Sequence, residues 1–364
     1  MKINFIGDCV FTNQSEFDEF FTIIKNTDNY KKADIIFANL EAPIVLSEKG
    51  KISKFGPHLR ASEKIDFRGS DKIVWCLANN HTMDYGRDGL EKCLRILREQ
   101  NQRYIGVNIP GSEYFFSNTD RSGICVLNVC ENEIGCDALD SLTTFDHLKV
   151  AKKIIDVKNK NDQLILFIHG GVEHSAVPSA EQKDICLRLM ELGADAVIYS
   201  HSHKISRTFT RDEKLTCYGL GNFYFKNFGR PATSYLDSVR SSLLLDVNDI
   251  RSYQLEYIPI EEDCLDEEMI ARELSEIQRI EEDEYEFSAY WSQWINDRFD
   301  SMLVHILFPK FFRGSRLLGS SSKFRKIFVH DNAVAHKLNI MTCASLREIY
   351  VQALKKYLAN EFRE

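Results

Sequence analysis

Residues that can bind a metal stand at the ends of five apolar segments in this chain. The segments cover residues 3–6, 35–40, 73–78, 164–168 and 196–199. The side chains that follow them are, in order, Asp8, Glu41, Asn80 with His81, His169, and His201 with His203. A short buried strand that ends in such a residue is how an open sheet collects a ligand site at the carboxyl ends of its strands. The pattern predicts a dinuclear metal centre assembled from loops far apart in sequence.

These side chains suit the hydrolysis of a phosphoester. That reaction needs a nucleophilic hydroxide at neutral pH and positive charge near the transferring group, and two metal ions about 3.5–4 Å apart supply both. Glu41 is the candidate that bridges the ions. The remaining ligands would be Asn80, His169 and His201 for one ion, and Asp8 and His203 for the other. Imidazole with carboxylate and amide oxygens suits Mn²⁺, Fe or Zn²⁺ better than Ca²⁺, so we expect one or two transition-metal ions.

His81 is the first candidate for a catalytic side chain. It directly follows a predicted ligand, and imidazole can protonate a leaving-group oxygen near neutral pH. Asp84, close behind it, and Glu173 are two further catalytic candidates.

Several glycines and histidines have simpler interpretations. Gly170 and Gly171 would let the backbone come close to a ligand or metal. A tight turn beneath the site is expected at Gly219, Gly221 and Asn222. A structural or exposed position is expected for His58, His147, His305, His330 and His336, because none of them follows a predicted strand.

Composition excludes some classes of protein. The net charge is −8, whereas general nucleic-acid binding favours a basic chain. The ten cysteines form no C-x-x-C pair, and several lie in apolar segments, where a free cysteine behaves as a small apolar residue. The sequence shows no signal-peptide pattern and no run of about 18 apolar residues. We therefore expect a cytoplasmic protein that binds no nucleic acid.

The periodicity of apolar residues predicts the elements that hold these side chains. Helices are expected over residues 16–31, 89–100 and 182–192. After about residue 215 the pattern changes to strands joined by turns, over residues 215–218, 242–247 and 253–258. This combination predicts an α+β fold in which two mixed sheets form a sandwich flanked by helices. An acidic stretch with helical periodicity begins near residue 261. We therefore divide the chain into a sandwich domain, residues 1–260, and a mainly helical C-terminal extension, residues 261–364.

Six motifs follow one another at the predicted strand ends. They are Gly7-Asp8, Asn39-Leu40-Glu41, Ala78-Asn79-Asn80-His81 with Asp84-Tyr85-Gly86, His169-Gly170-Gly171-Val172-Glu173, His201-Ser202-His203 and Gly219-Leu220-Gly221-Asn222-Phe223. Their order and spacing resemble bacterial capsule-synthesis proteins of the CapA type, the family associated with poly-gamma-glutamate capsules. That family is similar to calcineurin-like metallophosphoesterases. The resemblance covers roughly residues 1–260 and implies a four-layer αββα sandwich, a role in capsular or cell-envelope polymer synthesis, and a phosphorylated or anionic polymer-related substrate.

Two of these motifs depart from the phosphoesterase pattern. That pattern begins with Asp-x-His, but Cys9 and Val10 follow Asp8, so one histidine ligand is missing. The second motif has Glu41 where an aspartate is usual. One metal site is therefore expected to be weak or to recruit Glu173 or His174, and a centre with one tightly bound metal is the alternative.

Two classes of function are compatible with these motifs. The first is a metal-dependent hydrolase, most simply of a phosphoester, and the intact Asn80-His81 pair favours it. The second is a non-catalytic assembly or polymer-binding factor of a capsule-synthesis machine, which the missing histidine favours. Hydrolysis of an amide bond by the same centre is a third possibility.

The C-terminal region contains a basic and aromatic segment, residues 308–328. No acidic residue occurs from 301 to 330, and six cations alternate with phenylalanines: Lys310, Arg313, Arg316, Lys323, Arg325 and Lys326. Such a segment can contact an anionic membrane peripherally or bind an anionic polymer. Alternatively, its cations pair with the acidic residues of 261–300. The sequence does not predict an oligomeric state.

Overall fold

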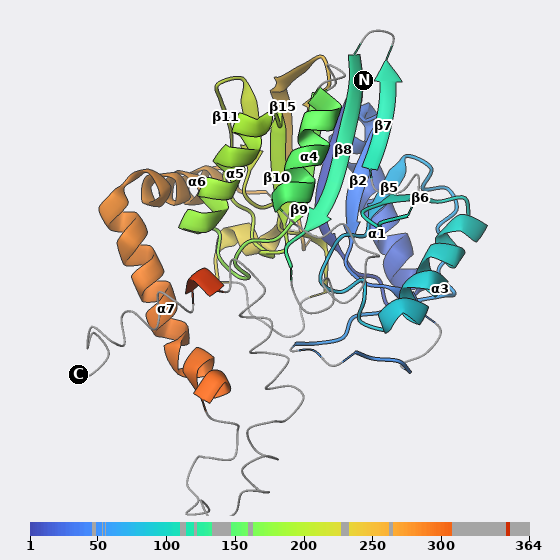
Figure 1. The fold of residues 1–364 in the computed structure, drawn as a ribbon, viewed down its shortest axis with the longest axis horizontal. Coiled ribbons are helices and arrows are strands. Elements are labelled where there is room, and N and C mark those ends of the chain that lie inside the picture. Colours follow the sequence, from blue (N-terminus) through green and yellow to red (C-terminus); the bar gives the residue numbers. More distant parts are fainter. Residues whose placement is uncertain are drawn as a thin grey trace, which may run out of the picture.

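Two β-sheets packed face to face form the centre of the molecule, and helices cover their outer faces (Figure 1). The computed structural model describes residues 1–45, 49–52, 54, 56–109, 114–119, 122–132, 147–158, 163–226, 233–261, 265–307 and 347–349. The arrangement is the four-layer αββα sandwich that the motifs implied, and the predicted fold class is confirmed.

The first sheet is mixed. Its strands are β1 (Lys2–Cys9), β2 (Ile35–Leu40), β5 (Ile73–Cys76), β6 (Arg103–Ile105), β13 (Asn222–Tyr224), β14 (Val239–Asp246) and β15 (Asp249–Pro259). They lie in the order β15-β14-β1-β2-β5-β6, and β13 pairs with the end of β1. β1, β2, β5 and β6 are parallel, whereas β14 is antiparallel to β1.

The second sheet has a parallel centre and antiparallel edges. Its strands are β7 (Tyr114–Thr119), β8 (Ser122–Cys130), β9 (Gln163–His169), β10 (Ala196–Ser200), β11 (Thr208–Arg211) and β12 (Lys214–Cys217). The order is β11-β12-β10-β9-β8-β7. A short parallel pair, β3 (Ile44–Val45) and β4 (Ala61–Ser62), lies apart from both sheets.

Helices cover the outer faces of the sheets, and further helices follow toward the C-terminus. They are α1 (Gln14–Asn26), α2 (Asp28–Lys32), α3 (Gly86–Glu99), α4 (His147–Lys158), α5 (Ala180–Leu192), α6 (Glu267–Glu282) and α7 (Glu284–Leu307), with a 3₁₀ turn at Tyr235–Ser238. The prediction of one helix over residues 16–31 is wrong. The chain breaks at Thr27, which has an extended backbone and whose hydroxyl accepts the Tyr30 amide hydrogen, so a second helix begins there.

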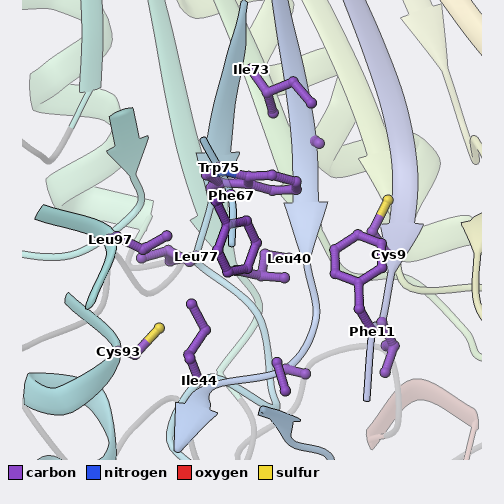
Figure 2. Close-up of a cluster of buried hydrophobic side chains, with 14 of the residues drawn as sticks. Cys9, Phe11, Leu40, Ile44, Phe67, Ile73, Trp75, Leu77, Cys93 and Leu97 are labelled. Carbon is purple, nitrogen blue, oxygen red and sulfur yellow. The ribbon is translucent and has the colours of Figure 1, made fainter. Parts of the chain in front are cut away.

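Alternating side chains of the strands build two kinds of core. Between the sheets, Phe5 stacks on Phe37 with ring centroids 5.2 Å apart and meets Phe167 of the other sheet edge-on at 5.5 Å. On the outer face of the first sheet, Trp75 packs edge-on against Phe67 at 5.5 Å, in the apolar layer under α1 and α3 (Figure 2). A third cluster joins the second sheet to α4 and α5.

The C-terminal helices pack on the loops at one end of the sandwich. Trp291 of α7 lies against Val172, and its Nε1 donates to the Pro178 carbonyl at 3.3 Å. The acidic stretch is thus helical as predicted, although the proposed boundary at residue 260 stays a prediction. Among the described residues, no helix is both long and apolar enough to cross a membrane. Segment 308–328 lies outside the described residues.

Candidate metal centre

The alternation of the strands carries the predicted ligands into one place. Ile35 and Phe37 of β2 belong to the core between the sheets, and Glu41 follows on the same alternation just past the strand. In β9, Phe167 lies in this core and His169 is the next residue on that face. The parallel strands of both sheets therefore deliver their terminal side chains to the same inter-sheet edge.

An irregularity in β1 is needed to bring Asp8 there. The register against β2 shifts between Ile6 and Asp8, so Asp8 stands opposite Asn39. Its Oδ1 accepts a hydrogen bond from Asn39 Nδ2 at 2.7 Å. The residue skipped in the register is Gly7, where a Cβ atom would lie only 1.9 Å from the Gly221 carbonyl oxygen. Only glycine allows β1 this close contact with the chain leading into β13.

The first group of candidate ligands is Glu41, His169 and His201. One ligand atom from each lies within 4.8 Å of the others. His169 Nε2 is 3.0 Å from His201 Nδ1, 3.0 Å from Asn80 Oδ1 and 3.8 Å from Glu41 Oε1. The three predicted ligands of one ion therefore meet around a single point, with Glu41 at its edge.

The second group is Asp8, Glu41 and His203, again within 4.8 Å. His203 Nδ1 lies 3.3 Å from Asp8 Oδ2 and 2.8 Å from Asn222 Oδ1. Asn222 was interpreted as part of a turn, but it begins β13 and holds this histidine. Glu41 belongs to both groups, which is the position predicted for a bridging carboxylate.

Glu41 is the strongest indication that a cation belongs here. Its side chain is fully buried, and neither carboxylate oxygen has a hydrogen-bond partner. A buried carboxylate normally carries hydrogen bonds or a counter-charge, because leaving it unpaired is costly. Divalent metal ions fit this donor set, since both groups combine carboxylate with imidazole.

The electrostatics of the groups agree with this assignment. Burial, and then the neighbouring Asp8, raise the pKa of Glu41 well above its usual value. Burial and the adjacent His201 and His203 lower the pKa of His169 far below its usual value, which keeps the ring neutral as a ligand must be. Burial opposes the charge on His203, but Glu41 and Asp8 raise its pKa to about 9. A metal ion and a proton would therefore compete for His203.

The loop that carries the two histidines after β10 has an unusual backbone. His201 and His203 have φ angles of 96° and 58°, in the region that favours glycine. Non-glycine residues in this region are uncommon and cluster at functional sites, where surrounding contacts hold them. Here the His201 amide donates to Asp8 Oδ2 at 3.2 Å, which ties the loop to the opposite sheet.

His81 lies at the side of the two groups. Its Nε2 is 3.8 Å from Glu41 Oε1, and its Nδ1 is 2.8 Å from Asp84 Oδ2. Burial and the nearby Lys54 ammonium lower the pKa of His81, although Asp84 opposes them. Burial would raise the pKa of Asp84, but the neighbouring His81 and the charge of Lys54 lower it. Asp84 thus acts on His81 rather than on the ligands.

Glu173 and His174 lie at the outer margin of the site. Glu173 is exposed and belongs to neither ligand group. His174 stacks on His203 with ring centroids 5.6 Å apart. Gly170 and Gly171 were expected to let the backbone approach a ligand or metal. In the structure Gly170 makes room for the side chain of Glu131, from which a Cβ atom at this position would lie only 2.5 Å. The close approach is made by this carboxylate, which accepts the Gly171 amide hydrogen at 3.1 Å.

The sequence analysis assigned no role to four residues that contact the predicted ligands or their neighbours. Asn39 donates to Asp8 and lies 3.1 Å from His169 Nδ1, so it orients two ligands. Asn79 donates to Asn39 Oδ1 at 3.1 Å and accepts from the His81 amide. Glu131 directly follows β8, so the strand-end signal used for the other residues would have found it. Lys54, a further contact of His81, follows no strand and carries no such signal.

The other histidines contribute nothing to the centre as far as the structure describes them. His58 Nε2 contacts the Ile52 carbonyl at 2.7 Å, which fits the structural role expected for it. The side chains of His147 and His305, and all of His330 and His336, lie outside the described residues. Seven cysteines in the described ranges are buried free thiols, as the apolar context of several of them suggested.

Comparison with known proteins identifies the family. A family model described as "Bacterial capsule synthesis protein PGA_cap" matches residues 2–227, a stretch that contains all six predicted ligands. The chain belongs to this family. The resemblance inferred from the six motifs is therefore confirmed.

Two curated relatives are similar to the chain at low identity. It is 25% identical over 210 residues to the capsule biosynthesis protein CapA of Bacillus anthracis, covering 54% of this chain and 51% of that protein. It is 21% identical over 297 residues to the PGA biosynthesis protein CapA of Bacillus subtilis (strain 168), covering 76% and 78%. The chain therefore spans about half the length of the first relative. A solved structure of a hypothetical protein from Thermus thermophilus aligns with a TM-score of 0.41 at 15% identity, over 71% of this chain and 100% of that one.

Proposed function

We propose that the protein is a metal-dependent hydrolase of a phosphoester that acts in capsular or cell-envelope polymer synthesis. The observation that supports this most is the buried Glu41 carboxylate, which is shared by two ligand groups and has no hydrogen-bond partner. Glu41 with Asn80, His169 and His201 would hold one ion, and Glu41 with Asp8 and His203 the other. Ions bound there would supply a nucleophile at neutral pH and positive charge for a phosphoryl group.

The protein's own side chains would orient and polarise the substrate. Nε2 of His81 faces the ligand groups, so this ring would donate a hydrogen to the leaving-group oxygen or hydrogen-bond a phosphoryl oxygen. Asp84, on the Nδ1 side of His81, would hold Lys54 beside this ring. Glu173, exposed at the margin, would meet the part of the substrate that extends into solvent.

The names of the relatives support a proposal for the substrate class. Both are named for biosynthesis, one of a capsule and one of PGA. We therefore propose a phosphorylated or otherwise anionic compound related to the capsular polymer as the substrate. From the sequence we further propose a cytoplasmic location with peripheral membrane contact through segment 308–328.

A substrate screen tests this proposal. The full chain loaded with Mn²⁺ should hydrolyse chromogenic phosphodiesters or phosphomonoesters, and His201→Ala should lose both the activity and at least one ion. Lys158→Met is a matched control, because it removes a Lys–Asp pair with Asp195 at the start of β9, the opposite end of the strand from the centre. Metal-loaded protein that turns over none of these esters would contradict the proposal.

One observation favours a second function, that of a non-catalytic assembly or polymer-binding factor. Val10 occupies the position of the missing histidine, and its side chain is buried in the apolar core under α1. The second group therefore has only three ligand side chains among the described His, Cys, Asp and Glu residues. Binding of capsular polymer by metal-loaded protein that shows no turnover would support this alternative.

A further inference from the structure

Lys54 is a buried lysine beside the candidate centre. It lies between β3 and β4, and only 5% of it is exposed. Asp84 attaches this part of the chain to the centre: its carbonyl accepts from the Ile52 amide at 3.0 Å and its carboxylate from the Leu59 amide at 2.6 Å. Lysine is almost never buried unless it is paired. The position of Lys54 therefore requires an explanation from its contacts.

The ammonium group of Lys54 lies at the Nδ1 side of the His81 ring, away from the ligand groups. Nζ is 3.0 Å from His81 Nδ1 and 3.3 Å from the Asn80 carbonyl, and it pairs with the carboxylate of Asp84. The other ring nitrogen, Nε2, is 3.8 Å from Glu41 Oε1. The two nitrogens thus face different surroundings: Nδ1 faces Lys54 and Asp84, and Nε2 faces the ligand groups.

The contacts of Nδ1 allow two hydrogen-bond arrangements. An ammonium group has only hydrogens to donate, whereas a carboxylate can only accept. Nδ1 therefore either accepts from Lys54 or donates to Asp84 Oδ2, which is 2.8 Å away. Asp84 already accepts from the Leu59 amide and pairs with Lys54, so it has partners without a hydrogen from the ring. Lys54 has three hydrogens to donate, and its three contacts are the Asn80 carbonyl, the Asp84 carboxylate and Nδ1 of His81, so an acceptor at Nδ1 gives each hydrogen a partner.

We propose that Lys54 is a positioning residue that donates to Nδ1 of His81 and thereby places the single ring hydrogen on Nε2, facing the centre. The proposal deepens the proposed function and rests on it for its consequence. A neutral His81 with its hydrogen on Nε2 is a donor to a phosphoryl or leaving-group oxygen, whereas the other tautomer would present a lone pair to that oxygen. Lys54 would therefore decide whether His81 attracts or repels the oxygens of a phosphoester.

The tautomer can be measured directly. In full-length chain labelled with ¹⁵N-histidine, long-range ¹H–¹⁵N spectra show which ring nitrogen carries the hydrogen, and His81→Gln identifies the signals of His81. We expect the hydrogen on Nε2 in the parent, both in EDTA and with Zn²⁺. Lys54→Met should move it to Nδ1, toward Asp84, and Lys54→Arg, which keeps a cationic donor, should preserve the parent pattern. Lys158→Met, the matched loss of a Lys–Asp pair, should leave His81 unchanged.

Several results would overturn the proposal. A parent spectrum with the hydrogen on Nδ1, or on both nitrogens, would do so even if Lys54→Met does not fold. So would a Lys54→Met spectrum identical to that of the parent.

Kinetics separate this proposal from the proposed function. If a phosphoester is hydrolysed, Lys54→Met should lower kcat by about 10²-fold with unchanged metal content and little change in KM, the loss typical of one misplaced hydrogen-bond donor. If no phosphoester is hydrolysed, the proposed function fails, while the spectra still decide the role of Lys54.

Discussion

Replacing Glu41 by glutamine should change stability in opposite directions with and without metal. The carboxylate is fully buried, neither of its oxygens has a hydrogen-bond partner, and Asp8 lies beside it. A buried polar group left without a partner costs about 1–3 kcal/mol, and a charged group costs more than a neutral one such as the glutamine amide. Removal of the charge should therefore stabilise the metal-free protein by about 1 kcal/mol, which raises Tm by about 2–4 °C in a large domain.

With bound metal the parent should be more stable than Glu41→Gln. A ligand at 100 times its Kd adds about 2.7 kcal/mol to the stability of the state that binds it. Parent protein should therefore gain about 5–10 °C in saturating Mn²⁺, whereas Glu41→Gln lacks the shared ligand and should gain little.

The stability of the metal-free parent should also depend on pH. Because the pKa of Glu41 is raised in the folded state, the folded chain binds more protons, and the metal-free parent should lose stability as pH rises above 4.5.

Thermal melting in EDTA and in Mn²⁺, at pH 6 and pH 8, provides the assay. Asp84→Asn is the control, because it also neutralises a fully buried carboxylate but one that is paired with Lys54. It should be less stable than the parent in EDTA, since removing one partner of a buried ion pair is destabilising, yet it should still respond to Mn²⁺. Our reasoning is refuted if Glu41→Gln is less stable than the parent in EDTA, or if Mn²⁺ stabilises both proteins equally.

Three further predictions concern the C-terminal region. Burial raises the pKa of Glu281 at the end of α6 to about 7 although Arg207 opposes it, so the free energy of unfolding should fall by about 3 kcal/mol between pH 4.5 and 7. Urea titrations should show a smaller fall in Glu281→Gln, and an equal fall would count against this assignment. Trp291→Ala should release α7 from Val172, seen as faster trypsin cleavage within α7 while the circular dichroism of the sandwich is retained; unchanged proteolysis would argue against this packing. If segment 308–328 contacts membranes, reversing four of its charges should abolish co-sedimentation with anionic vesicles at low salt, whereas internal ion pairing predicts a lower Tm and no vesicle binding by the parent. The four charges are Arg313, Arg316, Arg325 and Lys326.

The ligand groups could be predicted from the sequence because their geometry follows from strand alternation. Residues 35–40 and 164–168 could be recognised as buried strands, and a sandwich whose two sheets end at the same edge brings Glu41 and His169 together. The order of the six motifs, through the family resemblance, predicted the four-layer αββα sandwich. Glu131 could have been found in the same way, because it follows the apolar strand β8.

Other features depend on packing that periodicity does not encode. Lys54 reaches His81 only because Asp84 binds the segment between β3 and β4 through two backbone amides. Asn39 was visible within a motif, but its contacts with Asp8 and His169 exist only once both sheets are assembled. The break at Thr27 was missed for a different reason, since apolar residues continue at helical spacing across a residue that caps a new helix.

The most direct test of the central claim is an anomalous difference map from crystals of the full chain loaded with Mn²⁺. We predict one or two peaks within coordination distance of Glu41, the first touching His169 and His201, and the second, if present, touching Asp8 and His203. A map without a peak beside Glu41 at millimolar Mn²⁺, or with Mn²⁺ bound only elsewhere, would contradict the account.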